Sequence, residues 1–185
     1  KNFNILLKEK GMQNLFNLVS QRSFLLSSFM GVLLCLIGFY WLERSLGLPI
    51  LDVLPSYDMK TVEQNMLGYG EEGRKLYAWA SLTLDVIFPL CYVVFFAGLI
   101  TLFGGLKSIR WLALVPFLLG LIDLTENIQI CTMLVQFPDI TDSQVGMSST
   151  TTSIKHSIVI VVYSLVALLA IYTFTRWVRI QLNRD

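Results

Sequence analysis

The segment LIDLTEN, residues 121–127, lies in the middle of an apolar run that is long enough to cross a bilayer. Asp123, Glu126 and Asn127 follow an i, i+3, i+4 spacing, so a helix places all three on one face. A carboxylate at that depth costs about 2.5–3.5 kcal/mol on insertion scales and therefore rarely faces lipid. We expect this face to point at other helices, a water-filled cavity or a ligand, with the rest of the chain arranged around it.

The composition indicates a membrane protein. Of 185 residues, 55% are hydrophobic and 15% charged, and the mean hydropathy is +0.64. A soluble domain of this size has too little interior to bury so much apolar surface. The net charge of +1 and the lack of a basic stripe argue against nucleic-acid binding. We therefore predict an all-α integral membrane protein. We also expect no cofactor and no metal; the three cysteines lie in apolar runs without the CxxC spacing of a metal site.

Hydropathy predicts a bundle of four transmembrane helices within a domain of residues 23–178. The spans are expected at about residues 24–42, 77–103, 111–137 and 154–178. An amphipathic arm, residues 1–22, precedes them and is expected to lie in the headgroup region. Residues 179–185 form a tail. Basic residues concentrate in the arm, the 104–110 turn and the tail, so both termini are expected on the cytoplasmic side of the membrane. This membrane is either that of the endoplasmic reticulum or a bacterial inner membrane.

Two connections between the spans are predicted to be long and polar. Residues 43–76 contain two prolines and four glycines, with a short interfacial helix expected over 59–67 that Gly68, Gly70 and Gly73 end. Asp52 and Asp58 in this segment are expected to be solvated. Residues 139–153 include the run SSTTTS and are expected to form a flexible loop.

Pro89 lies within the second span, one turn after Asp85. A proline has no N–H and leaves the carbonyl four residues earlier without its helical partner, so the helix is expected to kink beside this acid. Membrane helices tolerate such a break when a neighbouring group satisfies the freed carbonyl.

Polar groups of three spans are predicted to lie at one level. At about 1.5 Å per residue, Asp85, Asn127 and Glu126 lie about 12–17 Å below the outer end, and Tyr163 about 14 Å below it. We predict Asp85 and Glu126 as catalytic residues, because a neutral and an ionised carboxyl group side by side can give and take a proton. Further candidates for contacting a ligand are Asp123, Asn127, Tyr163 and, at the mouth beside Lys155, His156.

Three functional interpretations follow from this constellation. The first is an enzyme or binding protein for a lipid-like or sterol-like small molecule. The second is a small structural or assembly subunit, or a homodimer, in which the arm clasps a membrane-protein partner and the polar groups join helices. The third, proton or cation transport, needs polar groups on the cytoplasmic side as well. The inner halves of the second and third spans offer only Thr101 and Gly120, which argues against transport.

Four short segments, GRKLY (73–77), LDVIFPL (84–90), KSIR (107–110) and LDVLP (51–55), give the chain a resemblance to a known family. Over about residues 38–178 it resembles the EXPERA family, the four-span fold of emopamil-binding sterol isomerases and their ligand-binding relatives. The resemblance implies that a carboxylate near Asp85 faces a pocket for a sterol-like cationic ligand. The isomerases also have a His and a Glu within the first span, whereas this chain has only Glu43 at its end. The resemblance therefore implies a relative of the isomerases that binds a ligand or catalyses a different reaction.

Overall fold

The computed structural model describes residue 11, residues 13–104 and residues 110–183, and this part of the chain is helical, without strands. Four helical segments are long and apolar enough to cross a membrane, which confirms the predicted bundle of four transmembrane helices. Three of them contain the helices α2 (Arg22–Leu46), α5 (Val115–Gln136) and α6 (Asp142–Leu182). The other consists of α3 (Met59–Leu82) and α4 (Leu84–Gly104). The chain is thus a multi-pass membrane protein.

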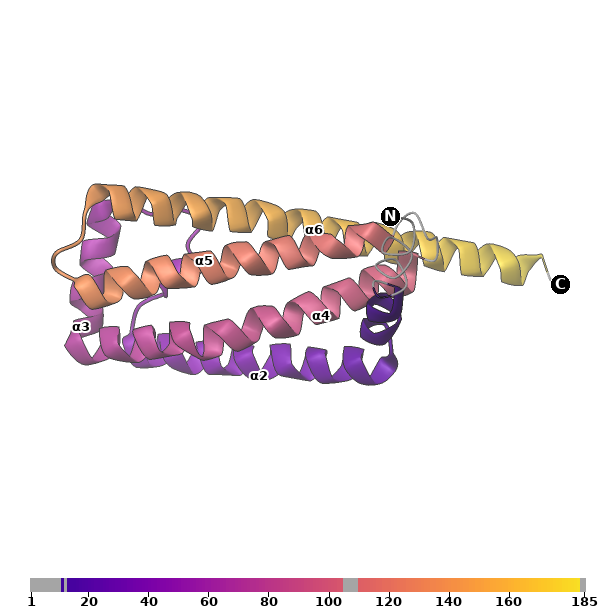
Figure 1. Ribbon diagram of the computed structural model, residues 1–185, viewed down its shortest axis with the longest axis horizontal. Helices are drawn as coiled ribbons and strands as arrows, with labels where there is room; N and C mark the ends of the chain where they lie inside the picture. The colour runs from indigo at the N-terminus through magenta and orange to yellow at the C-terminus, as the bar shows by residue number, and fades with distance from the viewer. Residues whose placement is uncertain (1–10, 12, 105–109, 184–185) are drawn as a thin grey trace.

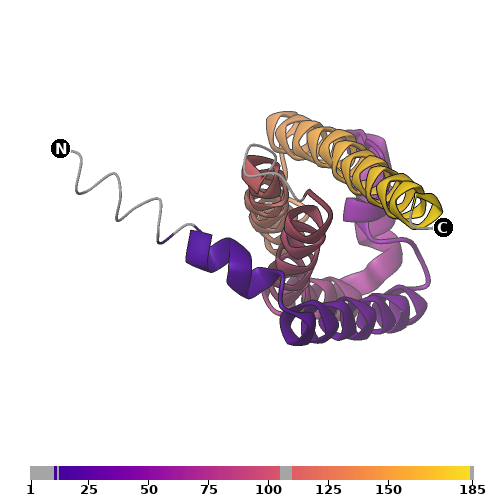
Figure 2. The ribbon, with the colours of Figure 1, turned by 90° about the vertical axis from the view of Figure 1, so that its right-hand side faces the viewer.

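The long helices lie side by side along one axis (Figure 1). α2 packs mainly on α4, α4 packs on α5, and α6 packs on α5 and α4. Viewed along the bundle, α2 and α6 lie apart from one another, on opposite sides of the assembly (Figure 2). α2 is therefore attached mainly through α4, and its side toward α6 is the less packed side of the bundle.

α3 changes direction at Gly70, whose φ of 67° and ψ of 179° are not helical. Its first half crosses the end of the bundle, and its second half runs in line with α4 (Figure 1). The predicted helix over 59–67 is thus present, and a glycine ends it as expected, because glycine adopts positive φ without steric cost. The 3-10 helix η1 (Leu51–Val53) lies in the connection before α3.

The predicted second span, 77–103, is interrupted at Thr83, which separates α3 from α4. Thr83 has φ −123° and ψ −76°, and its hydroxyl donates to the carbonyl of Trp79 at 2.7 Å. Such bonds from a threonine to the preceding turn often bend helices. The span is continuous in direction, but two helices build it.

The prediction of a flexible loop over residues 139–153 is wrong. α6 begins at Asp142, where Thr141 and Gln144 form a capping box in which each side chain bonds the other residue's backbone. The three threonine hydroxyls of the SSTTTS run turn back onto their own helix, as Thr150 does to Gly146 O at 2.7 Å. Serine and threonine have poor helix propensity because they compete for the backbone, and here the competing bonds fall within the helix. α6 consequently starts about three turns before the predicted span.

A short helix over residues 13–19 packs on the opposite end of the bundle. Phe16 and Val19 are buried, and Phe16 belongs to a cluster with Ile100 of α4 and Leu169 of α6. Two residues of the predicted apolar face, Phe16 and Val19, are therefore covered by this chain's own helices, whereas Leu15 is 42% exposed, and the expected position of the arm at the membrane surface stays a prediction. The predictions for residues 1–10 and 12 lie outside the described residues, as do those for 105–109 and 184–185.

Candidate functional site

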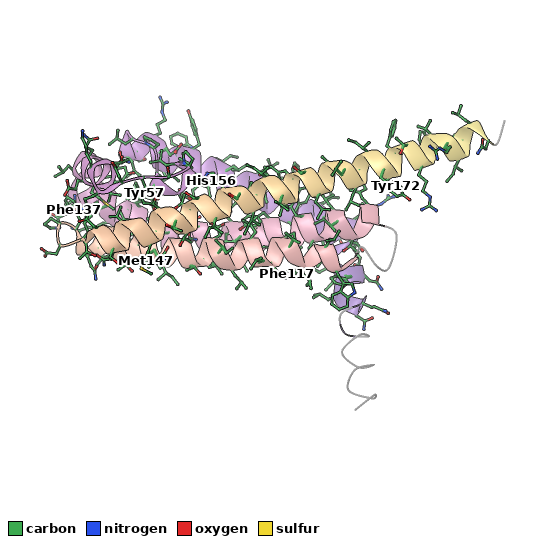
Figure 3. The ribbon with its side chains drawn as sticks, turned by 90° about the horizontal axis from the view of Figure 1, so that it is seen from above. Tyr57, Phe117, Phe137, Met147, His156 and Tyr172 are labelled. Atoms are coloured by element: carbon green, nitrogen blue, oxygen red, sulfur yellow. The ribbon has the colours of Figure 1, made fainter. Side chains whose placement is uncertain are left out.

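Ionisable side chains from four elements meet beneath the end of the bundle that α3 crosses. Asp123 and Glu126 come from α5, Asp85 from α4, Lys155 from α6 and Asp52 from η1, and all five are buried. Tyr57 and His156, labelled in Figure 3, lie near this end of the molecule. Of the groups that the sequence placed at one level, Asp85, Asp123 and Glu126 belong to this cluster, and α6 contributes Lys155 while the connecting segment contributes Asp52.

Lys155 is the centre of the cluster. Its Nζ contacts Glu126 Oε2, lies 3.3 Å from Asp123 Oδ1 and lies 3.9 Å from Asp52 Oδ2. The sequence placed Lys155 at the outer surface, and this is wrong, because its exposure is only 9%. The early start of α6 is the reason: it puts about three helical turns between Lys155 and the helix end.

Hydroxyl groups donate further hydrogen bonds to the two carboxylates on α5. Glu126, which is 0% exposed, accepts a hydrogen bond from Thr152 Oγ1. Asp123 Oδ2 accepts one from the Tyr92 hydroxyl at 2.8 Å. Since Lys155 contacts the other oxygen of each carboxylate, both acids are held by a cation on one side and a neutral donor on the other.

Asp85 differs from these two acids, because its carboxylate has no hydrogen bond or ion pair to any part of the chain that the structure describes. Its exposure is 3%. Its backbone carbonyl, by contrast, accepts a hydrogen bond of 2.5 Å from Asn127 Nδ2. This is the carbonyl that Pro89 was predicted to free, and a neighbouring helix satisfies it as expected, while α4 is one helix through Pro89 and the predicted kink stays a prediction.

Asp52 was expected to be solvated, and it is instead 8% exposed. Its Oδ1 is buried and has no hydrogen-bond partner among the described residues. Burial raises the pKa of Asp52, and the nearby Lys155 opposes that rise. Asp58 does lie at the surface as expected; it caps α3, and hydrogen bonds from Thr61 lower its pKa.

A cavity of about 170 Å³ borders the cluster. Asp52, Asp85, Asp123 and Lys155 line its polar part, while aromatic and aliphatic side chains of all four spans line the rest: Val32, Leu36, Phe88, Tyr92, Phe96, Leu119, Val159 and Tyr163. The cavity is therefore amphipathic, with ionisable groups in one part and hydrocarbon in the other.

A groove of about 480 Å³ lies between α2 and α6 on the less packed side of the bundle. It shares Asp52, Lys155 and Tyr163 with the cavity, so the two spaces adjoin. Glu43 of α2 and His156 of α6 also line it. His156 Nδ1 lies 2.9 Å from the Thr152 carbonyl and must donate to it, which leaves Nε2 for other contacts.

Comparison of the chain with models of protein families, with curated proteins and with solved structures finds no match. The geometry of the site is accordingly the basis for any functional assignment.

The candidate residues from the sequence fall into two groups in the structure. Asp85, Asp123 and Tyr163 line the cavity, and His156 lines the adjoining groove. Glu126 and Asn127 are buried behind that wall and do not appear among the lining residues. Their predicted roles at a ligand stay predictions, and their contacts are with Lys155 and Thr152 for Glu126 and with Asp85 for Asn127.

Sequence reasoning missed Lys155, Asp52 and Tyr92 as members of the site. A signal for Lys155 was present, because Ser148, Thr152 and Lys155 follow an i, i+4, i+7 spacing and share one helix face. This face is buried, with Ser148 and Thr152 both 0% exposed. Asp52 offered no comparable periodicity, since it lies in a short connection.

Proposed function

We propose that this protein binds, and by acid–base chemistry acts on, a lipid-like or sterol-like molecule that enters from the bilayer between α2 and α6. One observation carries the proposal: the buried carboxylate of Asp85 borders an amphipathic cavity without a hydrogen-bond partner from the described chain. A buried polar group that lacks a partner is costly, so such groups are normally satisfied. A ligand with a hydrogen-bond donor in its polar head would supply the partner.

The shape of the site supports a ligand with a polar head and an apolar body. Ligand sites typically combine apolar walls with a few placed polar groups. Here the cavity provides the carboxylates, and the groove toward α2 and α6 would hold the apolar body. Tyr163, whose exposure is 57%, lines both spaces and packs on Phe96 with ring centroids 5.4 Å apart.

In the proposed chemistry Asp85 exchanges a proton with the head of the ligand. Asp123, which lines the same cavity, provides a second carboxylate whose charge Lys155 and the Tyr92 hydroxyl stabilise. Two carboxyl groups in different surroundings can take the roles of acid and base. Glu126 and Asn127 act by positioning, since the former holds Lys155 and the latter holds the backbone at Asp85.

We also propose that the chain is related to the EXPERA family, which its sequence resembles. In that family a carboxylate near the position of Asp85 faces a ligand pocket, and the cavity beside Asp85 is consistent with such a role. Because the first span lacks the isomerases' His and Glu pair, we place the chain with relatives that bind ligands or catalyse another reaction.

Mass spectrometry of small molecules that co-purify with the protein tests the proposal. The wild-type protein should retain a lipid-like compound, and Asp85→Asn should lose it by about tenfold or more while its melting temperature stays close to that of the wild type. A protein that retains nothing specific, or an Asp85→Asn variant that retains the same compound equally, contradicts the proposal.

A pair of neighbouring substitutions tests the route between α2 and α6. Val159 lines both the cavity and the groove, whereas Ile160 is 66% exposed on another face of α6. Val159→Trp should block retention of the compound, and Ile160→Trp should not. Equal retention in both variants would rule out this route.

We further propose that both termini face the cytoplasm, so that the cavity lies toward the outer or lumenal side. This orientation follows from the distribution of Lys and Arg in the sequence. A cysteine introduced at Glu63 in α3, on a background without native cysteines, should react with an impermeant thiol reagent added outside intact cells or vesicles of known orientation. Labelling only after permeabilisation would reverse the assignment.

A further inference from the structure

Two grooves flank the second half of α3, away from the carboxylate cluster. The first has a volume of about 520 Å³ and lies between α3 and α5, with Ala78 and Leu82 facing Leu134 and Val135. The second has a volume of about 330 Å³ and lies between α3 and α2, where Leu76 and Gly38 line it. Trp79 of α3 lines both grooves and is 69% exposed. The grooves thus run on either side of one indole ring.

The first groove changes from charged to apolar along α3. Glu71, Arg74 and Lys75 line it at one level, and Ala78, Trp79 and Leu82 follow on successive turns. The distance from the first to the last of these is about 16 Å along the helix axis. A charged end, an aromatic ring at the next turn and an apolar end follow the profile of a membrane interface, where tryptophan is enriched beside the headgroups.

Arg74 is held in place at the charged end of the groove. Its Nη1 donates to the carbonyl of Met66 at 2.8 Å, and its guanidinium lies 4.8 Å from the centre of the Phe137 ring. Lys75 is instead engaged by Glu71 and Glu72, at 2.8 and 2.9 Å. Among the described residues no carboxylate pairs with Arg74, so its remaining N–H groups are the cationic donors that the groove offers. A guanidinium matches a phosphate oxygen pair well.

We propose that a two-chain phospholipid binds here, with its phosphate on Arg74 and one acyl chain in each groove beside Trp79. The charged end accounts for the phosphate, and the paired apolar grooves account for two chains rather than one. The site shares no residue with the cavity at Asp85, so it is independent of the function proposed above.

Native mass spectrometry with three added lipids tests the number of chains and the phosphate. The probes are dioleoyl phosphatidylglycerol, its single-chain lyso form and dioleoylglycerol, which lacks the phosphate. The wild-type protein should bind the two-chain phospholipid about tenfold or more tightly than the lyso form, because burying two methylene groups corresponds to about that factor. Arg74→Gln should remove the preference for phosphatidylglycerol over dioleoylglycerol.

Substitutions that fill one groove each distinguish this site from the lipid that surrounds any membrane protein. Val135→Trp fills the first groove and Leu76→Trp the second, and Ile128→Trp on a lipid-facing part of α5 is the matched control. Each filling variant should bind the two-chain and single-chain phospholipids equally, and the control should behave like the wild type. Equal binding of all three probes by the wild type, or an unchanged preference in both filling variants, overturns the proposal. The melting temperature of each variant separates loss of the site from loss of the fold.

Discussion

Replacing Lys155 with methionine tests whether one ammonium group holds the buried carboxylates together. The lysine contacts Glu126 and lies 3.3 Å from Asp123, and its side chain is almost entirely buried. Methionine keeps most of the length and apolar volume of the stem, so the main loss is the charge. Removing one partner of a buried ion pair costs about 3–5 kcal/mol, because the other partner is left uncompensated. We expect Lys155→Met to lower the free energy of unfolding by about this amount.

The second half of the test is a double-mutant cycle with Glu126→Gln. This single change leaves Lys155 with Asp123 as a partner, so its cost should be smaller, about 1–3 kcal/mol. In the double variant the buried carboxylate that the methionine would leave uncompensated is absent. The loss in the double variant should therefore be smaller than the sum of the two single losses by more than about 1 kcal/mol.

The free energies can be measured by titrating the purified protein from a mild detergent into SDS and following its helix content. Lys60→Met on the exposed part of α3 is the control, and it should change the free energy of unfolding by less than about 0.5 kcal/mol. Single losses that add within about 0.5 kcal/mol, or a Lys155→Met loss as small as that of the control, would refute the central role of this lysine.

Three further predictions concern the backbone, the packing and the pH dependence. Asn127→Ala should lower the free energy of unfolding by about 1–3 kcal/mol. The same change should cost less in a Pro89→Ala background, because the N–H of the alanine can bond the freed carbonyl of Asp85. SDS titrations of the wild type, the two single variants and the double variant measure the two losses. Gly98→Ala should destabilise by about 1–3 kcal/mol in the same assay, because a Cβ there meets a backbone carbonyl of the 13–19 helix, whereas Gly146→Ala has open space and should stabilise slightly. Folding raises the pKa of Asp52, so the wild-type protein should lose stability as the pH rises from the ordinary pKa of this group through the raised pKa. The melting temperature of Asp52→Asn should therefore rise relative to that of the wild type between pH 4 and pH 7. A difference that stays constant over this range would contradict the prediction.

The bundle could be predicted from hydropathy because the bilayer leaves few solutions. A chain that crosses the membrane core must satisfy its backbone within helices, so four apolar runs predict four helical spans whatever packs against them. Pro89 illustrates how far this local reasoning extends. The freed carbonyl of Asp85 follows from the chemistry of proline alone, but its partner, Asn127, lies on another helix and depends on the packing of α4 against α5.

The start of α6 could not be predicted because two local signals conflict there. The SSTTTS run is typical of loops, while Thr141 and Gln144 are spaced as a capping box that starts a helix. Propensity is a weak signal that tertiary packing often overrides. Ser148 and Thr152 are fully buried and bond the Tyr57 hydroxyl of the connecting segment, at 2.7 and 3.3 Å, and these contacts exist only once the bundle has formed.

The boundary of α6 decides how the carboxylates are to be interpreted. If the helix began near Ile154, as the apolar run predicts, Lys155 would reach the surface and the acids would have no cation within the membrane. With the helix beginning at Asp142, the lysine compensates Glu126 and Asp123, and those two acids no longer need a ligand to explain their burial. Asp85 is the exception, because Lys155 does not contact its carboxylate and no other described residue bonds it. Asp52 also lines the cavity, but it still lies 3.9 Å from the Lys155 ammonium group, so among the described residues Asp85 is the cavity carboxylate that most needs a ligand to explain its burial.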